Sequence, residues 1–322
     1  MSESHLLRIR HRTHYQYALP VSFQTHRLVV RPREGHDLRV ESLVLRIEPQ
    51  AELVWTRDIF GNSIGHAHFL EKGQELLFDV DVTVRRFFDP ARPPVVAQSP
   101  MPYPLEYDTL EHGIITGYLT PVYAEEMAAV KDFIGTLPDP GGFPSAEAFV
   151  VQLAEIIHGK IRYQRREKKG VQTPATTLAL GTGSCRDLAT LMMETLRHLG
   201  IAARFASGYL DCQATRAARG STHAWTEAYF PLLGWCGFDP TSGKHCTQQH
   251  IVTGTSHHPR GVMPVSGNFT GGSRAFQKMA VTVEFSTPEV TGAPSGLLEE
   301  GEPRVDMDER QEGEHRTSNV ED

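Results

Sequence analysis

The sequence has few cysteines and no long apolar run, and both absences narrow what the protein can be. Only four of its 322 residues are Cys, too few for the disulfide framework of a small secreted domain. No segment approaches the roughly 20 apolar residues that a membrane-spanning helix needs. The first residues also lack the basic and apolar regions of a signal peptide. We therefore expect free thiols in a reducing compartment, that is, a cytoplasmic protein with no membrane partner.

The sequence also lacks a surplus of basic residues. Its net charge of −7 comes almost entirely from the C-terminal tail, and the rest of the chain is nearly neutral. Residues 288–322 hold eleven Asp or Glu and three Arg, whereas residues 1–287 hold 28 acids and 29 Lys or Arg. A nearly neutral body lacks the cationic surface that binds a phosphate backbone, so we predict no nucleic-acid partner. The acidic tail has few apolar residues and is predicted to be disordered.

The hydrophobic residues, 39% of the chain, suffice for packed cores, and the length predicts two domains. Apolar and polar residues alternate over residues 6–17, 43–47 and 76–84, and turn-forming residues separate these segments. This pattern is typical of an antiparallel sandwich or barrel. Six prolines lie between residues 89 and 104 and exclude helix and central strand there. We predict an antiparallel β-domain at 1–88 and a Pro-rich linker at 89–119.

The second half mixes helical and strand-like patterns and is predicted to form a second domain, residues 120–287, followed by the tail at 288–322. Helical spacing appears at 123–134 and 145–161, and strand-like patterns at 202–210, 223–230, 235–239 and 278–285. The clearest helix spans residues 184–199, where apolar residues recur on one face. Ser184 is a suitable N-cap with Asp187 three residues later, and Gly200 suits the C-terminal end.

This helix places Cys185 in its first turn. Free N–H groups and the helix dipole favour an anion there, and the thiolate is the reactive form of cysteine. Gly181 and Gly183 are expected to leave the approach to the sulfur open. The position suits a nucleophile, although cysteine is also a common small core residue.

A nucleophile needs a base, and His223 and Asp239 lie on two strand-like segments joined by a short turn. Cys, His and Asp in this order could form a thiolate–imidazolium pair with an orienting carboxylate. Taken singly, the histidine could be a core residue and the aspartate a turn residue before Pro240. A four-residue turn at 231–234 would place the two side chains on opposite faces of the sheet. A three- or five-residue turn, or a bulge at Gly234 or Gly237, would return them to one face.

Several motifs resemble the bacterial transglutaminase-like superfamily, collinearly over about residues 120–285. They are Val171-Gln-Thr-Pro174, Gly183-Ser-Cys-Arg-Asp187, residues 199–210, Thr222-His-Ala-Trp-Thr-Glu227 and Gly234-Trp-Cys-Gly-Phe-Asp-Pro-Thr241. The N-terminal region, with Asp58-Ile-Phe-Gly-Asn62, resembles the β-domain that precedes this core in one bacterial branch. The resemblance implies an α+β fold: a papain-like transglutaminase core after a sandwich-like β-domain. Arg186 stands where many members have Gln or another residue, which we interpret as a branch difference.

The resemblance implies a catalytic triad of Cys185 as nucleophile, His223 as base and acid, and Asp239 as its orienter. The expected reaction is acyl transfer from a peptide or protein amide, to water in a protease or amidohydrolase and to an amine acceptor in a transglutaminase. The motif does not choose between these outcomes. The Cys185 backbone N–H is the expected oxyanion donor, and the second donor is not assigned. A non-catalytic binding module with this fold is the alternative.

Other chemistry-bearing residues were weighed against simpler interpretations. Cys212, Cys236 and Cys246 lack C-x-x-C spacing, so we predict no metal site and no cofactor. Trp225 and Trp235 could wall the cleft or simply pack. Glu227 shares a face with His223 and could contact it. Residues 261–272 are expected to form a loop beside the cleft.

Overall fold

The N-terminal region forms two antiparallel sheets. The structure is a computed structural model that describes residues 3–88, 100–166, 170–211, 221–272 and 274–288. Residues 289–322 of the predicted tail and residues 89–99 of the predicted linker lie outside these residues. The strands of this region are β1 (Glu3–Phe23), β2 (His26–Leu28), β3 (Leu38–Glu48), β4 (Ala51–Arg57), β5 (Ser63–Phe69) and β6 (Lys72–Phe88). The sheet orders are β15-β1-β6-β3, with β16 also on β1, and β14-β2-β5-β4.

Period-two alternation produces this sandwich, as the sequence predicts. Along β1, Leu7 and Ile9 are buried whereas Arg8 and Arg10 are not. Buried apolar side chains from both sheets form one core between them. Its members include Tyr17, Phe23, Leu28, Ala67, Leu76 and Phe78.

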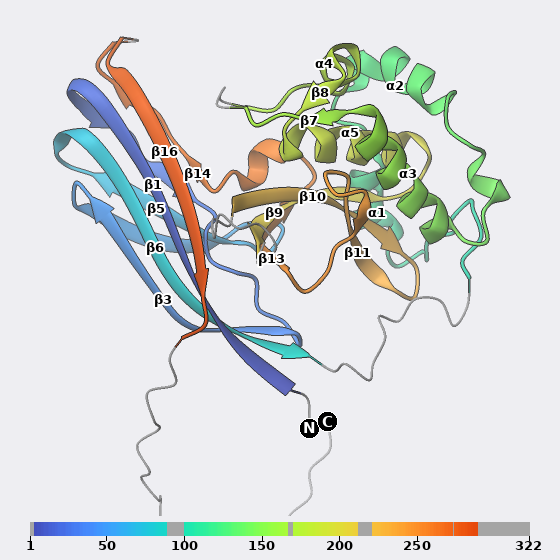
Figure 1. The fold of residues 1–322 in the computed structure, drawn as a ribbon, viewed down its shortest axis with the longest axis horizontal. Coiled ribbons are helices and arrows are strands. Elements are labelled where there is room, and N and C mark those ends of the chain that lie inside the picture. The colour runs from blue at the N-terminus through green and yellow to red at the C-terminus, as the bar shows by residue number, and fades with distance from the viewer. Residues whose placement is uncertain (1–2, 89–99, 167–169, 212–220, 273, 289–322) are drawn as a thin grey trace, which may run out of the picture. The chain divides into compact units, whose positions relative to one another are not determined.

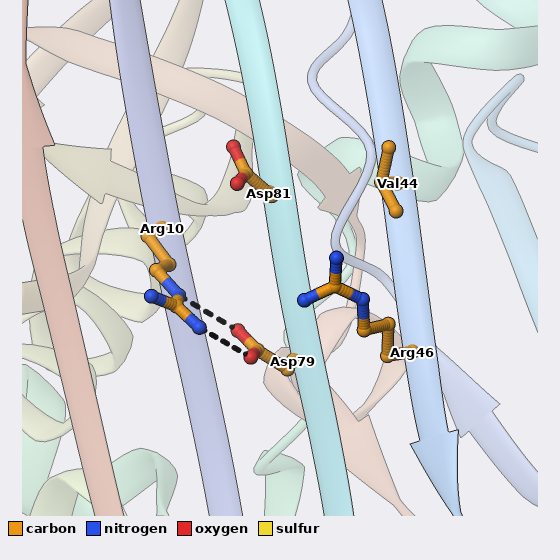
Figure 2. A pocket seen from close by; sticks show the side chains of 5 residues that line it. All are labelled: Arg10, Val44, Arg46, Asp79 and Asp81. Atoms are coloured by element: carbon orange, nitrogen blue, oxygen red, sulfur yellow. Dashed lines mark hydrogen bonds and ion pairs between the residues drawn. The ribbon is translucent and has the colours of Figure 1, made fainter.

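Ion pairs cover the outer face of the larger sheet. Figure 2 shows Arg10 on β1 reaching Asp79 on β6, with an Nη2–Oδ2 distance of 2.8 Å. Arg12 contacts the same carboxylate at 3.0 Å. The hollow between Arg10, Asp79 and Arg46 measures about 10 Å³, room for roughly one water molecule. We interpret this face as a solvated surface and not as a ligand site.

The last strands return to the N-terminal sandwich. β14 (Val265–Ser266) pairs with β2, and β15 (Phe269–Thr270) and β16 (Phe276–Ser286) both pair with β1. The sequence predicts a strand at 278–285 but assigns it to the second domain, because alternation marks a strand without naming its partner. Figure 1 shows β16 running beside β1. The described ends of the chain therefore meet in one sheet, and the second half is inserted between them.

Helices pack against a second five-stranded sheet. Its order is β12-β11-β10-β9-β13, from β9 (Ala203–Leu210), β10 (Ser221–Phe230), β11 (Gly234–Asp239), β12 (Lys244–His245) and β13 (His250–Ser256). A short parallel pair joins β7 (Arg162–Tyr163) and β8 (Thr182–Gly183). The α-helices are α1 (His112–Leu119), α2 (Met127–Ile134), α3 (Ala146–Lys160), α4 (Pro174–Leu180) and α5 (Cys185–His198). Three 3₁₀ turns span Ala124–Glu126, Pro140–Gly142 and Pro259–Val262.

Helix α5 lies against β10, and their apolar faces belong to one core (Figure 1). Leu188, Met192 and Leu196 on α5 are fully buried, as are Ala224 and Ala228 on β10. Helix α1 is a correction, because it lies in the stretch predicted as linker, beyond the last of the clustered prolines. No helix in the described part of the chain is long and apolar enough to cross a membrane.

A buried polar chain joins the sandwich to the second sheet through His11 on β1. The Tyr209 hydroxyl donates to the Val30 carbonyl at 3.2 Å. The hydroxyl therefore accepts from Nδ1–H of His11, which lies 3.2 Å away. The Thr13 hydroxyl can then donate to Nε2 of His11, at 3.0 Å. These partners are neutral and fix a neutral imidazole.

The Asp58–Asn62 motif makes a second connection, to β13. The fully buried Asn62 side chain donates to the Thr255 carbonyl at 2.7 Å and accepts from the Thr255 N–H at 2.9 Å. Asp58 in turn accepts from the backbone and side-chain N–H groups of Asn62, both at 2.9 Å. The motif therefore ties the sandwich to a strand of the sheet that carries the site.

Candidate active site

Helix α5 begins at Cys185, as the sequence predicts. The Asp187 carboxylate accepts from the Ser184 backbone N–H and hydroxyl, each at 2.8 Å, and this cap starts the helix at the cysteine. Asp187 is fully buried and also binds Arg166, with both oxygens 2.7 Å from Nη1, and the Gln172 N–H at 2.6 Å. One carboxylate thus holds the segment before α4 against the start of α5.

The two glycines before Cys185 also have roles in packing and backbone conformation. A Cβ on Gly183 would lie 2.9 Å from Asp187 Cβ and 3.1 Å from a Leu188 methyl group. Gly183 is thus required by packing behind the cap. Gly181 ends α4 in the left-handed conformation, with φ of 60°, where glycine is favoured.

The β10–β11 hairpin determines whether His223 and Asp239 share a face. Phe230 pairs with Gly234 and Thr226 with Phe238, so the turn has three residues, 231–233, and not four. Leu232 and Gly234 turn the chain with φ of 73° and 77°. The register contains no bulge. The three-residue alternative is therefore correct, and it returns both side chains to one face.

The structure brings all three predicted site residues together. Nε2 of His223 lies 3.1 Å from Oδ2 of Asp239, and Cys185 is near enough to raise the pKa of His223. The Asp239 Oδ1 accepts from the Thr241 N–H at 2.9 Å, which fixes the carboxylate. His223 is 7% exposed and Asp239 1%, so their mutual attraction is little screened by solvent.

His223 and Asp239 each stabilise the charged form of the other. Burial favours neutral imidazole, but hydrogen bonds and charge from Asp239 and Cys185 outweigh it and raise the pKa of His223 to about 10. Burial opposes ionisation of Asp239 too, but His223 and His250 hold the pKa of its carboxyl well below its usual range. The geometry therefore favours a cationic imidazole between a carboxylate and a sulfur.

His250 is a site residue that sequence reasoning missed. Its Nε2 lies 3.6 Å from Oδ2 of Asp239, and its Nδ1 accepts from the Thr247 N–H at 3.1 Å. The proton of the neutral ring therefore resides on Nε2 and faces the carboxylate. The Trp225 ring meets the His250 ring edge-on at 5.2 Å between centroids. No motif marks His250, because its place depends on β13 pairing with β9.

His223, Asp239 and His250 are also a group in the described part of the chain whose ligand atoms could approach one metal ion. The proton on Nε2 of His250 argues against this use. A metal bound there would need that lone pair while Nδ1 is still accepting a hydrogen bond, which would leave the ring without a proton. The donor set therefore fits a hydrogen-bonded site better than a metal centre.

Cys185 and His223 open onto a cavity of about 260 Å³, which we call the cleft. Its sandwich wall includes Tyr15 on β1 and Met279 and Val281 on β16. Residues 263–265 border it, as predicted, but the segment 261–272 is not one loop, because it contains β14 and β15. Strands β1 and β16 thus give the sandwich a direct place at the candidate site.

Three other expectations near the site are now resolved. Glu227 does not contact His223: it pairs with Arg204, with an Nη2–Oε2 distance of 2.6 Å. The Arg204 guanidinium also lies over the Trp235 ring, 4.0 Å from its centroid. Trp225 is buried and stacks near His223, with ring centroids 6.2 Å apart. Among the described residues that line the cleft, neither tryptophan is present.

These features define a class of protein: an α+β chain with a transglutaminase-like core, a cysteine at a helix start, and a histidine and an aspartate on neighbouring strands. Residues 7–85 match the family model of the bacterial transglutaminase-like N-terminal region, and residues 141–240 match that of the transglutaminase-like superfamily. The two matches, in order, cover more than half of the chain. The protein belongs to the bacterial transglutaminase-like superfamily.

The chain is also similar to several bacterial proteins and to a solved structure. The uncharacterized protein Rv2569c of Mycobacterium tuberculosis is 27% identical over 285 residues, covering 83% of this chain and 88% of the relative. The uncharacterized protein ML0607 of Mycobacterium leprae is 34% identical over 108 residues, 32% of this chain and 37% of the relative. A proposed cysteine protease from Cytophaga hutchinsonii shares the fold, with a TM-score of 0.66, 19% identity, and coverage of 91% of this chain and 94% of that one.

Proposed function

We propose that the protein is a cysteine-dependent acyl transferase that acts on peptide or protein amides. Cys185 is the nucleophile, His223 the base and acid, and Asp239 the orienter of His223. The observation that carries the proposal is that His223 pairs with Asp239 at 3.1 Å and lines one cleft together with Cys185. A buried histidine that pairs with a carboxylate, beside a cysteine that opens onto a cavity, is the arrangement that cysteine-dependent acyl transfer requires.

The first half of the reaction forms a thioester. The Cys185 thiolate attacks the amide carbonyl carbon, and the C=O electron pair moves to oxygen. The Cys185 backbone N–H lies in the first turn of α5, where it has no intrahelical acceptor, and donates to this oxyanion. When the carbonyl re-forms, the C–N bond breaks, and the His223 imidazolium gives its proton to the departing nitrogen.

The second half releases the acyl group. Neutral His223 takes a proton from water or from an amine, which attacks the thioester carbonyl. The C–S bond breaks and the thiolate returns beside the imidazolium. Water yields a carboxylic acid, and an amine yields a new amide. The same three residues serve both outcomes, so the acceptor that enters the cleft decides between them.

Product masses test the proposal and separate the two outcomes. The purified full-length protein is incubated with a library of peptide amides, with and without methylamine, and the products are weighed by mass spectrometry. We expect hydrolysis or methylamine incorporation that Cys185→Ala abolishes and the matched thiol control Cys236→Ala retains. No product, together with unchanged peptide binding by the Cys185→Ala protein, would instead favour the non-catalytic binding module.

A further inference from the structure

The cleft carries positive charge beside the candidate nucleophile. Arg165, Arg166 and Arg186 all line it, and no Asp or Glu does among the described residues. Arg166 is neutralised by Asp187 at 2.7 Å. Arg165 and Arg186 make no ion pair with any residue that the structure describes. Among the described residues, these two guanidinium groups therefore have no ion-pair partner at the cleft.

Both free guanidinium groups act close to Cys185. Arg186 is the next residue in the chain, and Arg165 follows β7, which pairs with the strand just before α5. Burial raises the pKa of the Tyr163 hydroxyl, Cys185 raises it further, and Arg165 and Arg186 oppose the rise. All three groups thus influence one hydroxyl that also lines the cleft.

The opposite wall combines two polar residues, His11 and Thr13, with a larger apolar part. Tyr15, Met279 and Val281 present mostly hydrocarbon surface from the sandwich, and Met279 is 42% exposed. An apolar wall lowers the local dielectric and strengthens the field of the arginines. The volume of about 260 Å³ lies below the ~300–1,000 Å³ of complete small-molecule pockets. It suits one or two residues of a longer substrate.

We infer that the acyl donor is an acidic peptide segment, with a carboxylate held by Arg165 and Arg186 next to the scissile amide and an apolar group against the sandwich wall. This inference rests on the proposed function and names the substrate class of the same site. Guanidinium groups suit it because they bind carboxylates bidentately.

A pair of alkylating probes tests the charge preference without any need for turnover. Iodoacetate and iodoacetamide deliver the same carbon to sulfur, but only iodoacetate is anionic. The rate constants for Cys185 in the full-length protein are measured by mass spectrometry, and their ratio is compared between variants. We expect Arg165→Gln/Arg186→Gln to lower the iodoacetate-to-iodoacetamide ratio about 3- to 10-fold. The matched control Arg162→Gln, an exposed arginine on β7 outside the cleft lining, leaves the ratio unchanged.

The two probes distinguish failure of the acidic-donor inference from failure of the proposed function. An equal ratio in the wild type and the double variant overturns the acidic-donor inference. Slow labelling of Cys185 by neutral iodoacetamide, no faster than Cys236, instead counts against the proposed function. Damage to the sulfur site by the substitutions would lower both rates together and leave the ratio unaltered.

Peptide amides then test the substrate class itself. Pairs that differ only by Glu or Gln beside the reacting amide are compared by kcat/KM, and by Kd with the Cys185→Ala protein. The acidic member should be favoured about 3- to 10-fold in the wild type, and the double variant should lose that preference. Equal values for both members, or a preference that survives in the double variant, overturn the inference.

Discussion

Two buried histidines, one in the sandwich and one at the candidate site, have pKa values shifted in opposite directions. His11 is 2% exposed and His223 is 7% exposed, so burial penalises the charged form of both. Burial lowers the pKa of His11 to about 4, with only a weak opposing effect of Asp79. The pKa of His223 rises to about 10, because Asp239 and Cys185 outweigh the same penalty. The partners, and not the depth of burial, decide which histidine is charged.

The contrast has opposite consequences for stability. His11 has a folded pKa below its unfolded value of about 6.5, so its contribution is present above pH 6.5 and is lost as the pH falls toward 4. The folded pKa of His223 lies above that value, so its contribution is present below pH 6.5 and is lost as the pH rises through about 10.

Removing the Asp239 carboxylate, which supports the charged form of His223, is expected to have the largest effect. Asp239→Asn leaves an acceptor for the Thr241 N–H but takes away the charge that supports the His223 imidazolium. We expect amide turnover to fall on the order of 10³-fold, with circular dichroism unchanged. Asp81→Asn, which removes a carboxylate on the distant outer face of the sandwich, is the control. A loss smaller than about tenfold would contradict the orienting role.

The effect of His223 on its neighbour can be tested by comparing the reactivity of Cys185 with that of a buried thiol away from this histidine. Burial raises the pKa of Cys236 to about 11 and that of Cys246 well above the ordinary value. Roughly 10⁻⁴ of Cys236 is then thiolate at pH 7, whereas Cys185 lies beside an imidazolium. We expect iodoacetamide at pH 7 to alkylate Cys185 at least about 10²-fold faster than Cys236, as read by peptide mass mapping. In His223→Asn this advantage should shrink, and an undiminished advantage would show that His223 does not support the thiolate.

The lowered pKa of His11 can be tested by the pH dependence of the unfolding free energy. Between pH 7.5 and 4.5 the wild type should lose roughly 2–3 kcal/mol of unfolding free energy through His11, since each pKa unit corresponds to about 1.4 kcal/mol. His11→Gln removes this titration, so the pH dependence measured by urea unfolding should flatten by that amount. His14→Gln, a partly exposed position on the same strand, controls for loss of a histidine. Equal slopes for wild type and His11→Gln would show that His11 is not held neutral.

Features of the site that depend on neighbouring residues in the sequence are predicted correctly. Features that depend on pairing between distant strands are not. Helix α5 begins at Cys185 because cap and apolar spacing are both local. The face shared by His223 and Asp239 depends on a three-residue turn in which Leu232, a residue type that rarely does so, takes a positive φ. The partner of β16 could not be predicted, because alternation is the same whichever strand lies beside it. His250 was missed for the same reason, since only the β9–β13 pairing carries it to Asp239.

His250 offers the smallest and most specific test of the contrast, because it supports His223 only through Asp239. The Nε2–H of His250 faces Oδ2 of Asp239 at 3.6 Å, so we interpret it as a positioning residue for the carboxylate. We expect His250→Ala to lower kcat about tenfold with KM nearly unchanged. In His250→Gln the side-chain amide can still donate toward Oδ2, and most of the activity should return. Equal losses in both variants would mean that His250 supports the fold and does not orient Asp239. A parallel fall in unfolding free energy, measured in urea, would lead to the same conclusion.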